Sequence, residues 1–346
     1  MKHKQLAFLL AVLFLSSCQT EGALEKPYEE YRNVLSFKEE TFNILQLTDI
    51  HWTYVTKIKE AKDYLETLFL DAKKEKGHID LVAVTGDFFL EANKSIAKEL
   101  FSLLSSWDTP IAITYGNHDK EGEWSLDWLN KMVSTNKNFI AKTIDDNIYG
   151  DTNYYIDIQD GTNLLWQIYM IDSNSLAPKN FLRYQYDCVH EDQVRWMKGV
   201  ADRSKKGSSY LPSLGFLHIP PKEYGSAEEI LKKDPSKSLL GENHEKACPT
   251  LISSSFFETA KEINMKGMFF GHDHANDSVT EYKGMLMGYG VKSNTELYYH
   301  KDKKGFTLTG YAVYELRKDQ SWSIQHTYVD YSTKEVRRSS IWESAL

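Results

Sequence analysis

The sequence has only three cysteines in 346 residues, namely Cys18, Cys188 and Cys248. So few thiols exclude a disulfide-rich scaffold and argue against a cysteine-based structural zinc site. The spacing of Cys188 and Cys248 leaves open whether they pair or stay free. Positive charge is also scarce, because 41 Lys and Arg stand against 49 Asp and Glu and give a formal net charge of -8. We therefore expect no nucleic-acid partner, and any attraction for an anionic substrate must be local.

The apolar segment Leu6–Leu15 is too short to cross a bilayer by itself. It follows Lys2 and Lys4 and has the layout of a secretory signal. The sequence that ends it, Leu15-Ser16-Ser17-Cys18, resembles a bacterial lipobox. This resemblance implies a lipoprotein signal peptide over residues 1–17, export, and a membrane anchor on lipidated Cys18. An ordinary signal peptide with an incidental cysteine is the alternative.

The residues after the signal are polar and acidic as far as Glu40. We expect residues 18–40 to be a lipid-anchored spacer and residues 41–346 to be the catalytic domain. Tyr28, Tyr31 and Phe37 offer the alternative that part of this segment docks on the folded body. Gln19 follows the lipobox cysteine, which by resemblance to known sorting signals implies the outer membrane in a Gram-negative cell.

Short apolar runs alternate with segments of helical periodicity in the first half of the chain. The runs Asn43–Leu47, Leu81–Val84 and Ile111–Tyr115 are separated by amphipathic segments at Lys57–Lys76 and Asn93–Trp107. This order predicts parallel strands joined by helical crossovers. A hairpin around Asp160-Gly161 and alternating strands after Ser278 add antiparallel pairs. We therefore expect an α/β fold with two mixed sheets packed together and flanked by helices.

Five of the predicted strands end in Asp, Asn or His. Their C-terminal ends carry the residues Asp49, His51, Asp87, Asn117, His118, His218, His272 and His274. Open α/β sheets place ligands at this end of their strands. One such residue is usually a turn or capping residue, but five strand ends with oxygen and nitrogen ligands point to a metal site.

The five blocks together resemble the calcineurin-like metallophosphoesterases. The resemblance is carried, in order, by D-x-H at Asp49–His51, G-D at Gly86–Asp87, G-N-H-D at Gly116–Asp119, His218, and G-H-x-H at Gly271–His274. The sequence around them, including Asn153-Tyr154, Ile171-Asp172-Ser173 and Asp192-Gln193, is similar to the branch that contains the purple acid phosphatases. The resemblance implies a metallophosphoesterase fold with a dinuclear metal centre.

The same resemblance assigns the ligands of two divalent or trivalent transition-metal ions, of which Fe, Mn and Zn suit this donor set. One ion is held by Asp49, His51, Asp87 and His274. The other is held by Asp87, Asn117, His218 and His272, with Asp87 as the bridge. The chain departs from the purple enzymes because Leu90 stands at the place of their iron-binding tyrosine and His51 at the place of a glycine. We therefore expect a non-purple relative.

The predicted reaction is in-line attack of a metal-bridging hydroxide on phosphorus. By family resemblance His118 is not a ligand but assists the leaving group as a general acid or electrostatic stabiliser. Asp119 either orients His118 in catalysis or caps the following turn. The long segment Pro220–Cys248 is either a functional loop, in which Tyr224 contacts substrate, or an ordinary surface loop. Asp172 is expected to be a structural hydrogen-bond acceptor and not an eighth ligand.

The function predicted from the sequence is an exported phosphatase that hydrolyses small phosphate monoesters. The first alternative is a phosphodiesterase acting on a nucleotide or a glycerophosphodiester, because the same metal core serves both reactions. The second is a non-catalytic surface binding protein. The complete ligand set argues against the second alternative.

Overall fold

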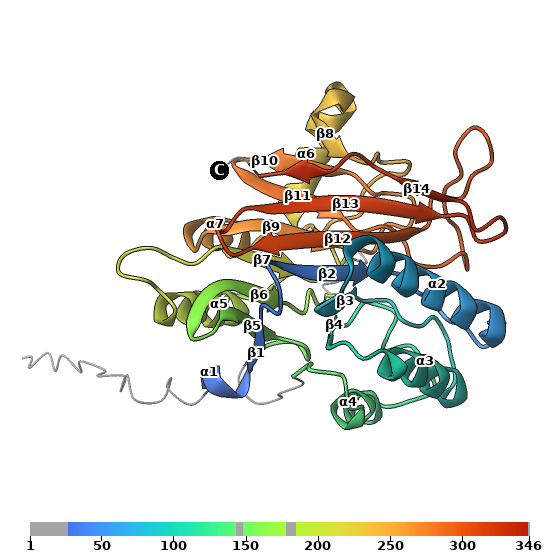
Figure 1. Cartoon of the computed structure of the whole chain (residues 1–346), viewed down its shortest axis with the longest axis horizontal. Helices are drawn as coiled ribbons and strands as arrows, with labels where there is room; N and C mark the ends of the chain where they lie inside the picture. Colours follow the sequence, from blue (N-terminus) through green and yellow to red (C-terminus); the bar gives the residue numbers. More distant parts are fainter. Residues whose placement is uncertain (1–26, 143–147, 178–184, 345–346) are drawn as a thin grey trace, which may run out of the picture.

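Strand β2 (Thr41–Leu47) is buried on both faces, between two layers of side chains. Ile44 belongs to the core that the two sheets share, whereas Leu45 belongs to the core under helices α2 and α3. The computed structural model describes residues 27–142, 148–177 and 185–344, and the predicted signal peptide with Cys18 lies outside these ranges. Two mixed sheets lie face to face with helices on both outer faces (Figure 1), as the sequence predicts.

One sheet has seven strands in the order β14-β13-β12-β2-β3-β4, with β15 paired to β13. Strands β2, β3 and β4 are parallel, and β12 and β13 complete the sheet in antiparallel pairs. The further bounds are β3 (Leu81–Thr85), β4 (Ile111–Thr114), β12 (Gly310–Arg317), β13 (Trp322–Val329), β14 (Val336–Arg338) and β15 (Trp342–Glu343). This sheet thus carries three of the five predicted ligand-bearing strands.

The other sheet has eight strands in the order β1-β5-β6-β7-β9-β11-β10-β8. It contains the predicted hairpin of β5 and β6, and its strands β6, β7, β9 and β11 run parallel. The bounds are β1 (Arg32–Ser36), β5 (Tyr154–Asp160), β6 (Asn163–Met170), β7 (Ser213–Phe216), β8 (Ser238–Leu240), β9 (Met265–Phe270), β10 (Val279–Tyr282) and β11 (Met285–Tyr289). Strands β7 and β9 carry the remaining two groups of predicted ligands.

The helices form through amphipathic patterns that face these sheets. In α2 (Ile58–Lys76) the buried residues include Ala61, Leu65, Leu68 and Ala72, at helical spacing, and Gly77 ends the helix. Helix α3 (Lys94–Ser106) begins at Asn93, whose side chain accepts from the amides of Ser95 and Ile96. The others are α1 (Pro27–Glu30), α4 (Leu126–Thr135), α5 (Glu191–Arg203), α6 (Lys222–Lys233), the 3₁₀ turn η2 (Pro235–Lys237) and α7 (Phe256–Glu262).

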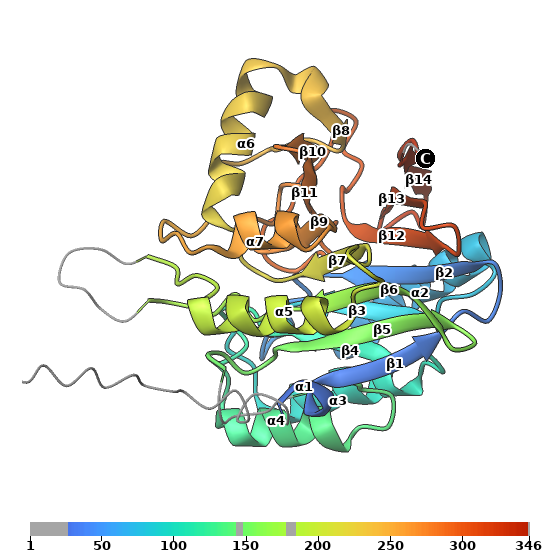
Figure 2. The same ribbon diagram turned by 90° about the vertical axis from the view of Figure 1, so that its left-hand side faces the viewer.

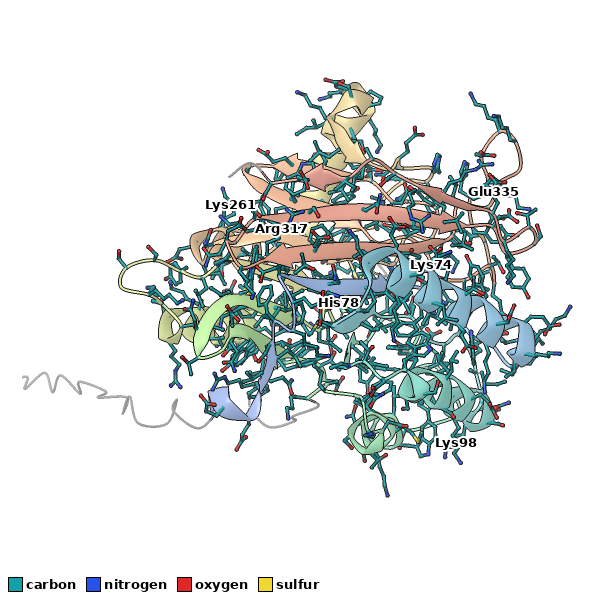
Figure 3. All side chains as sticks on the ribbon, in the orientation of Figure 1. Lys74, His78, Lys98, Lys261, Arg317 and Glu335 are labelled. Atoms are coloured by element: carbon teal, nitrogen blue, oxygen red, sulfur yellow. The ribbon has the colours of Figure 1, made fainter. Side chains whose placement is uncertain are left out.

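Helices α2 and α3 cover the seven-stranded sheet, and α5 and α7 cover the eight-stranded sheet (Figures 1 and 2). Charged side chains such as Lys74, Lys98 and Glu335 lie at the periphery (Figure 3). No helix of the described ranges is long and apolar enough to span a membrane.

The predicted boundary between spacer and catalytic domain at residue 41 is wrong. Strand β1 pairs in parallel with β5 from Arg32 to Ser36 and forms an edge of the eight-stranded sheet. Tyr31 and Phe37, on either side of this strand, are buried in the core, and the ring of Phe37 packs against Phe42 at 5.8 Å. The folded body therefore begins before residue 41, and the alternative in which these aromatic residues dock is the one observed.

The segment Pro220–Cys248 is not a loop throughout. Its first half is helix α6, which stands beside β8 and β10 at the edge of the eight-stranded sheet (Figure 2). Both predicted descriptions of this segment as a loop are therefore wrong up to Leu240. Cys188 and Cys248 are free thiols, of which the first is buried and the second exposed.

Candidate metal centre

The predicted ligands converge where the two sheets meet at one edge. Strands β2, β3 and β4 deliver their ligands from the seven-stranded sheet, and β7 and β9 deliver theirs from the eight-stranded sheet. Every one of these residues follows its strand within four positions: Asp49, His51, Asp87, Asn117, His218, His272 and His274. All of them are buried. The parallel strands of each sheet thus place oxygen and nitrogen donors at a common point.

The backbone at this edge is strained. Asp49, His51, Asp87 and His272 have φ values of 51°, 49°, 52° and 82°. Residues with a Cβ rarely adopt this left-handed backbone region, and such strained residues are most common at functional sites. Gly86 has φ +78°, and a Cβ there would meet the His218 ring at 2.6 Å. Glycine at this position therefore allows β3 and His218 to approach each other.

The first group of donors is Asp49, His51, Asp87 and His274, whose ligand atoms all lie within 4.8 Å of one another. His51 Nε2 lies 2.8 Å from His274 Nε2 and 3.4 Å from Asp87 Oδ2. Two imidazole nitrogens and two carboxylates that face one point are a suitable donor set for a transition metal.

The second group is Asp87, His218 and His272, again within 4.8 Å. His218 Nε2 lies 3.1 Å from Asp87 Oδ2 and 3.1 Å from Asn117 Oδ1, so Asn117 joins this group. The other ring nitrogen of His218, Nδ1, lies 2.9 Å from the carbonyl oxygen of Thr85. A carbonyl only accepts, so Nδ1 carries the hydrogen and Nε2 faces the donors.

Asp87 belongs to both groups, and its two oxygens differ. Oδ1 accepts the backbone N–H of His118 at 2.9 Å. Oδ2 is buried and lies 3.4 Å from His51 Nε2 and 3.1 Å from His218 Nε2, so one ring nitrogen of each group faces it. A buried carboxylate oxygen is costly unless a cation meets it. The donor set therefore fits two metal ions that share Asp87.

The electrostatics of the site favour cations. Burial alone would raise the pKa of Asp87, but His218 and the other histidines hold that pKa well below its usual range. The same pairing, working against burial, raises the pKa of His218 to about 10. A metal ion at Nε2 must replace this proton, so metal binding here releases protons.

His118 follows Asn117 in the sequence, but its side chain belongs to neither donor group. Its Nδ1 lies 2.6 Å from Glu121 Oε2, and its side chain is 33% exposed. Burial opposes protonation, but Asp87 and Glu121 raise the pKa of His118. Glu121 is therefore the carboxylate that orients His118, and the sequence analysis missed it. Its spacing of three residues after His118, within one turn, was the available signal.

The prediction of Asp119 as a catalytic residue is wrong. Its carboxylate is fully buried and accepts backbone N–H groups of Gly116 at 2.7 Å, Asp87 at 3.0 Å, Phe88 at 2.7 Å and Phe89 at 3.2 Å. These bonds tie the turn after β3 to the turn after β4. Asp119 is thus a positioning residue for Asp87, and the capping alternative is close to what is observed.

The prediction of Tyr224 as a substrate contact is also wrong. Its side chain is fully buried, its hydroxyl lies 2.6 Å from Ser278 Oγ, and its ring packs against Phe270 and Tyr289. Tyr224 anchors α6 to the sheet, because the first turn of that helix places it on the inner face.

Three further residues at the centre escaped the sequence analysis. Lys292 is buried, and its Nζ donates to the carbonyl oxygen of Asp49 at 2.8 Å. The ring of Tyr298 stacks on His274 at 4.4 Å, and the ring of Tyr186 meets the His272 ring edge-on at 4.4 Å. All three come from segments outside the five blocks, so only the tertiary structure brings them to the ligands.

Comparisons with known proteins agree with this geometry. The model of the calcineurin-like phosphoesterase family matches residues 42–276, a range that contains all the donors. "Probable inactive purple acid phosphatase 14" of Arabidopsis thaliana is 26% identical over 320 residues, 82% of this chain and 77% of that protein. "Probable inactive purple acid phosphatase 28" of the same plant is 26% identical over 293 residues, 74% of this chain and 71% of that protein.

A solved structure is similar as well. The crystal structure of a dimetal phosphatase from Danio rerio has a TM-score of 0.56 and 12% sequence identity. The match covers 83% of this chain and 96% of that one. At this identity the likeness shows a common fold.

Proposed function

Because the chain belongs to the calcineurin-like phosphoesterase family, we propose that it is an active phosphatase that hydrolyses phosphate monoesters with two bound metal ions. The observation that carries this proposal is the position of Asp87, which belongs to both donor groups and whose Oδ2 lies between the Nε2 atoms of His51 and His218. Iron, manganese or zinc suits these donors, which are imidazole nitrogens and carboxylate or amide oxygens.

The metal ions, when bound, supply Lewis acid chemistry that activates water and neutralises charge on the phosphoryl group. The chain itself holds the donors rigidly: Asp119 fixes the turn that bears Asp87, and Thr85 fixes the ring of His218. His118 lies at the partly exposed side of the centre with Glu121 on Nδ1. Its Nε2 is therefore the atom that donates a proton to the departing alcohol.

The names of the two plant relatives describe each as a "probable inactive" phosphatase. The question for this chain is whether it has kept the metal donors and the acid. Loss of activity in this fold follows most simply from loss of a ligand or of the acid. Here the donor set is complete, its members are mutually within 4.8 Å in each group, and His118 has its carboxylate partner. These features support turnover over a purely binding role.

The experiment compares p-nitrophenyl phosphate with bis(p-nitrophenyl) phosphate on the metal-reconstituted protein. The proposal predicts faster cleavage of the monoester. Faster cleavage of the diester would show that the protein is a phosphodiesterase. Two bound metal ions without hydrolysis of either ester would contradict an enzymatic role and favour the binding protein.

We further propose that the protein is exported and anchored by lipid at Cys18, with the outer membrane as its place in a Gram-negative cell. The support is the lipobox-like sequence Leu15–Cys18. Metabolic labelling with a fatty acid tests this: wild-type chain should be labelled and Cys18→Ala should not. Equal labelling of both would contradict it.

A further inference from the structure

A polar cavity of about 350 Å³ adjoins the turn that carries His118. It is lined by residues of four short segments: Lys120, Ile148, Tyr149, Gly150, Asp151, Asn174, Ser175, Leu176 and Asp187. Lys120 lies two residues after His118, in the turn closed by the hydrogen bond from the Glu121 N–H to the His118 carbonyl. The cavity therefore adjoins the turn that bears His118, the proposed acid for the leaving group.

A buried hydrogen-bond network supports this cavity. Asp172 Oδ2 accepts the N–H of Asp151 at 2.7 Å, and Asp172 Oδ1 accepts the N–H of Asn174 at 2.8 Å. Gln193 Nε2 donates to Asn153 Oδ1 at 2.8 Å and to the Asp172 carbonyl at 2.7 Å. Asp172 thus acts as a structural acceptor, as predicted. A satisfied network of buried polar groups holds its surroundings in one arrangement.

The backbone of the cavity wall is strained at Asn174, which has φ +65° and whose N–H donates to Asp172 Oδ1. Gly150 has φ +91°, which glycine adopts without strain. A Cβ at Gly150 would meet Asn174 Oδ1 and Asp172 Cβ at 2.9 Å each. Strained residues that the surrounding structure holds in place often belong to functional sites. The cavity thus lies between loop segments that this network holds in place.

The lining can bind hydroxyl groups. Lys120 Nζ donates to Asp151 Oδ2 at 2.6 Å, and His190 Nε2 lies 3.0 and 3.1 Å from the two oxygens of Asp187. Among the described lining residues Lys120 is the one cationic side chain, against the carboxylates of Asp151 and Asp187, and this balance disfavours a second phosphate group. Ile148 and Leu176 line the cavity, but most of the surface that its wall exposes is polar, which disfavours an alkyl chain. Carboxylates beside an ammonium group offer acceptors and donors together, which suits alcohol groups.

An aromatic surface lies at the same place. The ring of Tyr149 stacks on His190 at 3.7 Å with an angle of 10° between the planes, and Tyr149 is still 42% exposed. One face of the ring is covered, so the exposed part is open to a ligand. A volume of about 350 Å³ is at the small end of ligand cavities, which span roughly 300–1,000 Å³.

We propose that this cavity binds the alcohol portion of the substrate and selects an uncharged alcohol rich in hydroxyl groups, such as a sugar or polyol. The inference rests on the proposed phosphatase function, because the ester bond then lies at the metal centre next to His118. Tyr149 and Asp151, which line the cavity, are then residues that determine the specificity of the reaction.

The test compares sorbitol 6-phosphate with n-hexyl phosphate, which have the same carbon number and differ in hydroxyl groups. The metal-loaded protein should prefer sorbitol 6-phosphate in kcat/KM by about 10- to 100-fold, the worth of one hydrogen bond to a charged group. Tyr149→Ala and Asp151→Ala should each lower this ratio about tenfold or more. Asp151→Ala leaves the buried network intact, because the side chain of Asp151 contacts Lys120 and only its backbone N–H serves the network.

The matched control is Tyr54→Ala, which removes a 66% exposed tyrosine outside the cavity and should leave the ratio unchanged. Equal kcat/KM for the two esters in the wild type, or a preference for phosphoethanolamine over sorbitol 6-phosphate, would overturn the proposal while the phosphatase function stands. If no phosphate ester is hydrolysed, the proposed phosphatase function is wrong. The proposal for the cavity is then tested by calorimetry of the binding of the two esters. Tighter binding of sorbitol 6-phosphate than of hexyl phosphate would then support it, and equal binding would overturn it.

Discussion

The backbone N–H of His118 donates to Asp87 Oδ1 at 2.9 Å, yet the two side chains have separate roles. The side chain of His118 takes no part in either donor group, whereas Asp87 is shared by both. We predict that His118→Ala keeps both metal ions and loses turnover by roughly 10²- to 10⁴-fold, most severely with poor leaving groups. Asp87→Ala should lose metal as well. Elemental analysis with steady-state kinetics checks this, and equal metal loss in both variants would refute the role of His118.

Glu121 holds the Nδ1 atom of His118 and is a positioning residue. Glu121→Gln should lower kcat by about 10- to 100-fold, as loss of the partner of a functional histidine does, without changing metal content. The loss should be larger for an alkyl phosphate than for p-nitrophenyl phosphate, because only the poor leaving group needs the acid. Glu123→Gln, an exposed neighbour, is the control and should behave as wild type. A uniform loss with both esters would indicate a merely structural effect.

Strand β1 is the element on which the extent of the folded body depends. Phe37, at its end, is 8% exposed, and its N–H donates to the carbonyl of Gln159 at 2.9 Å. Phe37→Ala should lower the free energy of unfolding by about 3–5 kcal/mol, measured by urea denaturation. Val34→Ala, on the same strand and 43% exposed, should change it by less than about 0.5 kcal/mol. Equal stability of the two variants would restore the interpretation of residues 18–40 as a spacer.

The turn between β13 and β14 depends on one carboxylate. Asp330 accepts the N–H groups of Ser332 at 3.0 Å, Thr333 at 2.9 Å and Thr307 at 3.1 Å. Burial acts against ionisation, but these bonds and the Ser332 hydroxyl lower the pKa of Asp330. A lowered pKa in the folded state stabilises the protein above the unfolded pKa of about 3.9, and this stabilisation is lost as pH falls toward the folded value.

Asp330→Asn should therefore lower the free energy of unfolding by about 1–3 kcal/mol at pH 7. The difference from wild type should shrink below about pH 4, where the unfolded wild type begins to take up a proton. Urea denaturation at pH 7 and pH 3 measures both values, with the exposed Asp108→Asn as the control. A difference that does not vary with pH would show that the charge of Asp330 is not involved.

The strands that bear ligands were predictable because their pattern is local. Leu81–Thr85 and Ile111–Thr114 are short, wholly buried runs that a polar residue ends, and this pattern survives without tertiary information. Strand β1 was not predictable in this way, because its burial varies along an edge and only pairing with β5 makes it a strand. Helix α6 was not predicted, because most of its residues are charged or small and its few buried residues do not form a clear apolar pattern.

In the whole molecule, the centre depends on two sheets that lie face to face and whose ligand-bearing strands end at the same place. The sequence predicted the donors, because each lies directly after its strand. It did not predict Lys292, which is 243 positions from the residue that it contacts, or the cavity beside Lys120, which four separate segments build. Such features depend on the packing of distant segments and have no local pattern.

The central claim is a dinuclear centre in which Asp87 is shared, and counting metal ions per chain tests it most directly. Native mass spectrometry of the reconstituted protein should show two ions in the wild type. Asn117→Ala, which removes a donor of one group, should retain about one ion, and Asp87→Ala fewer than one. One ion per wild-type chain with full monoester hydrolysis, or two ions retained in Asp87→Ala, would contradict the account.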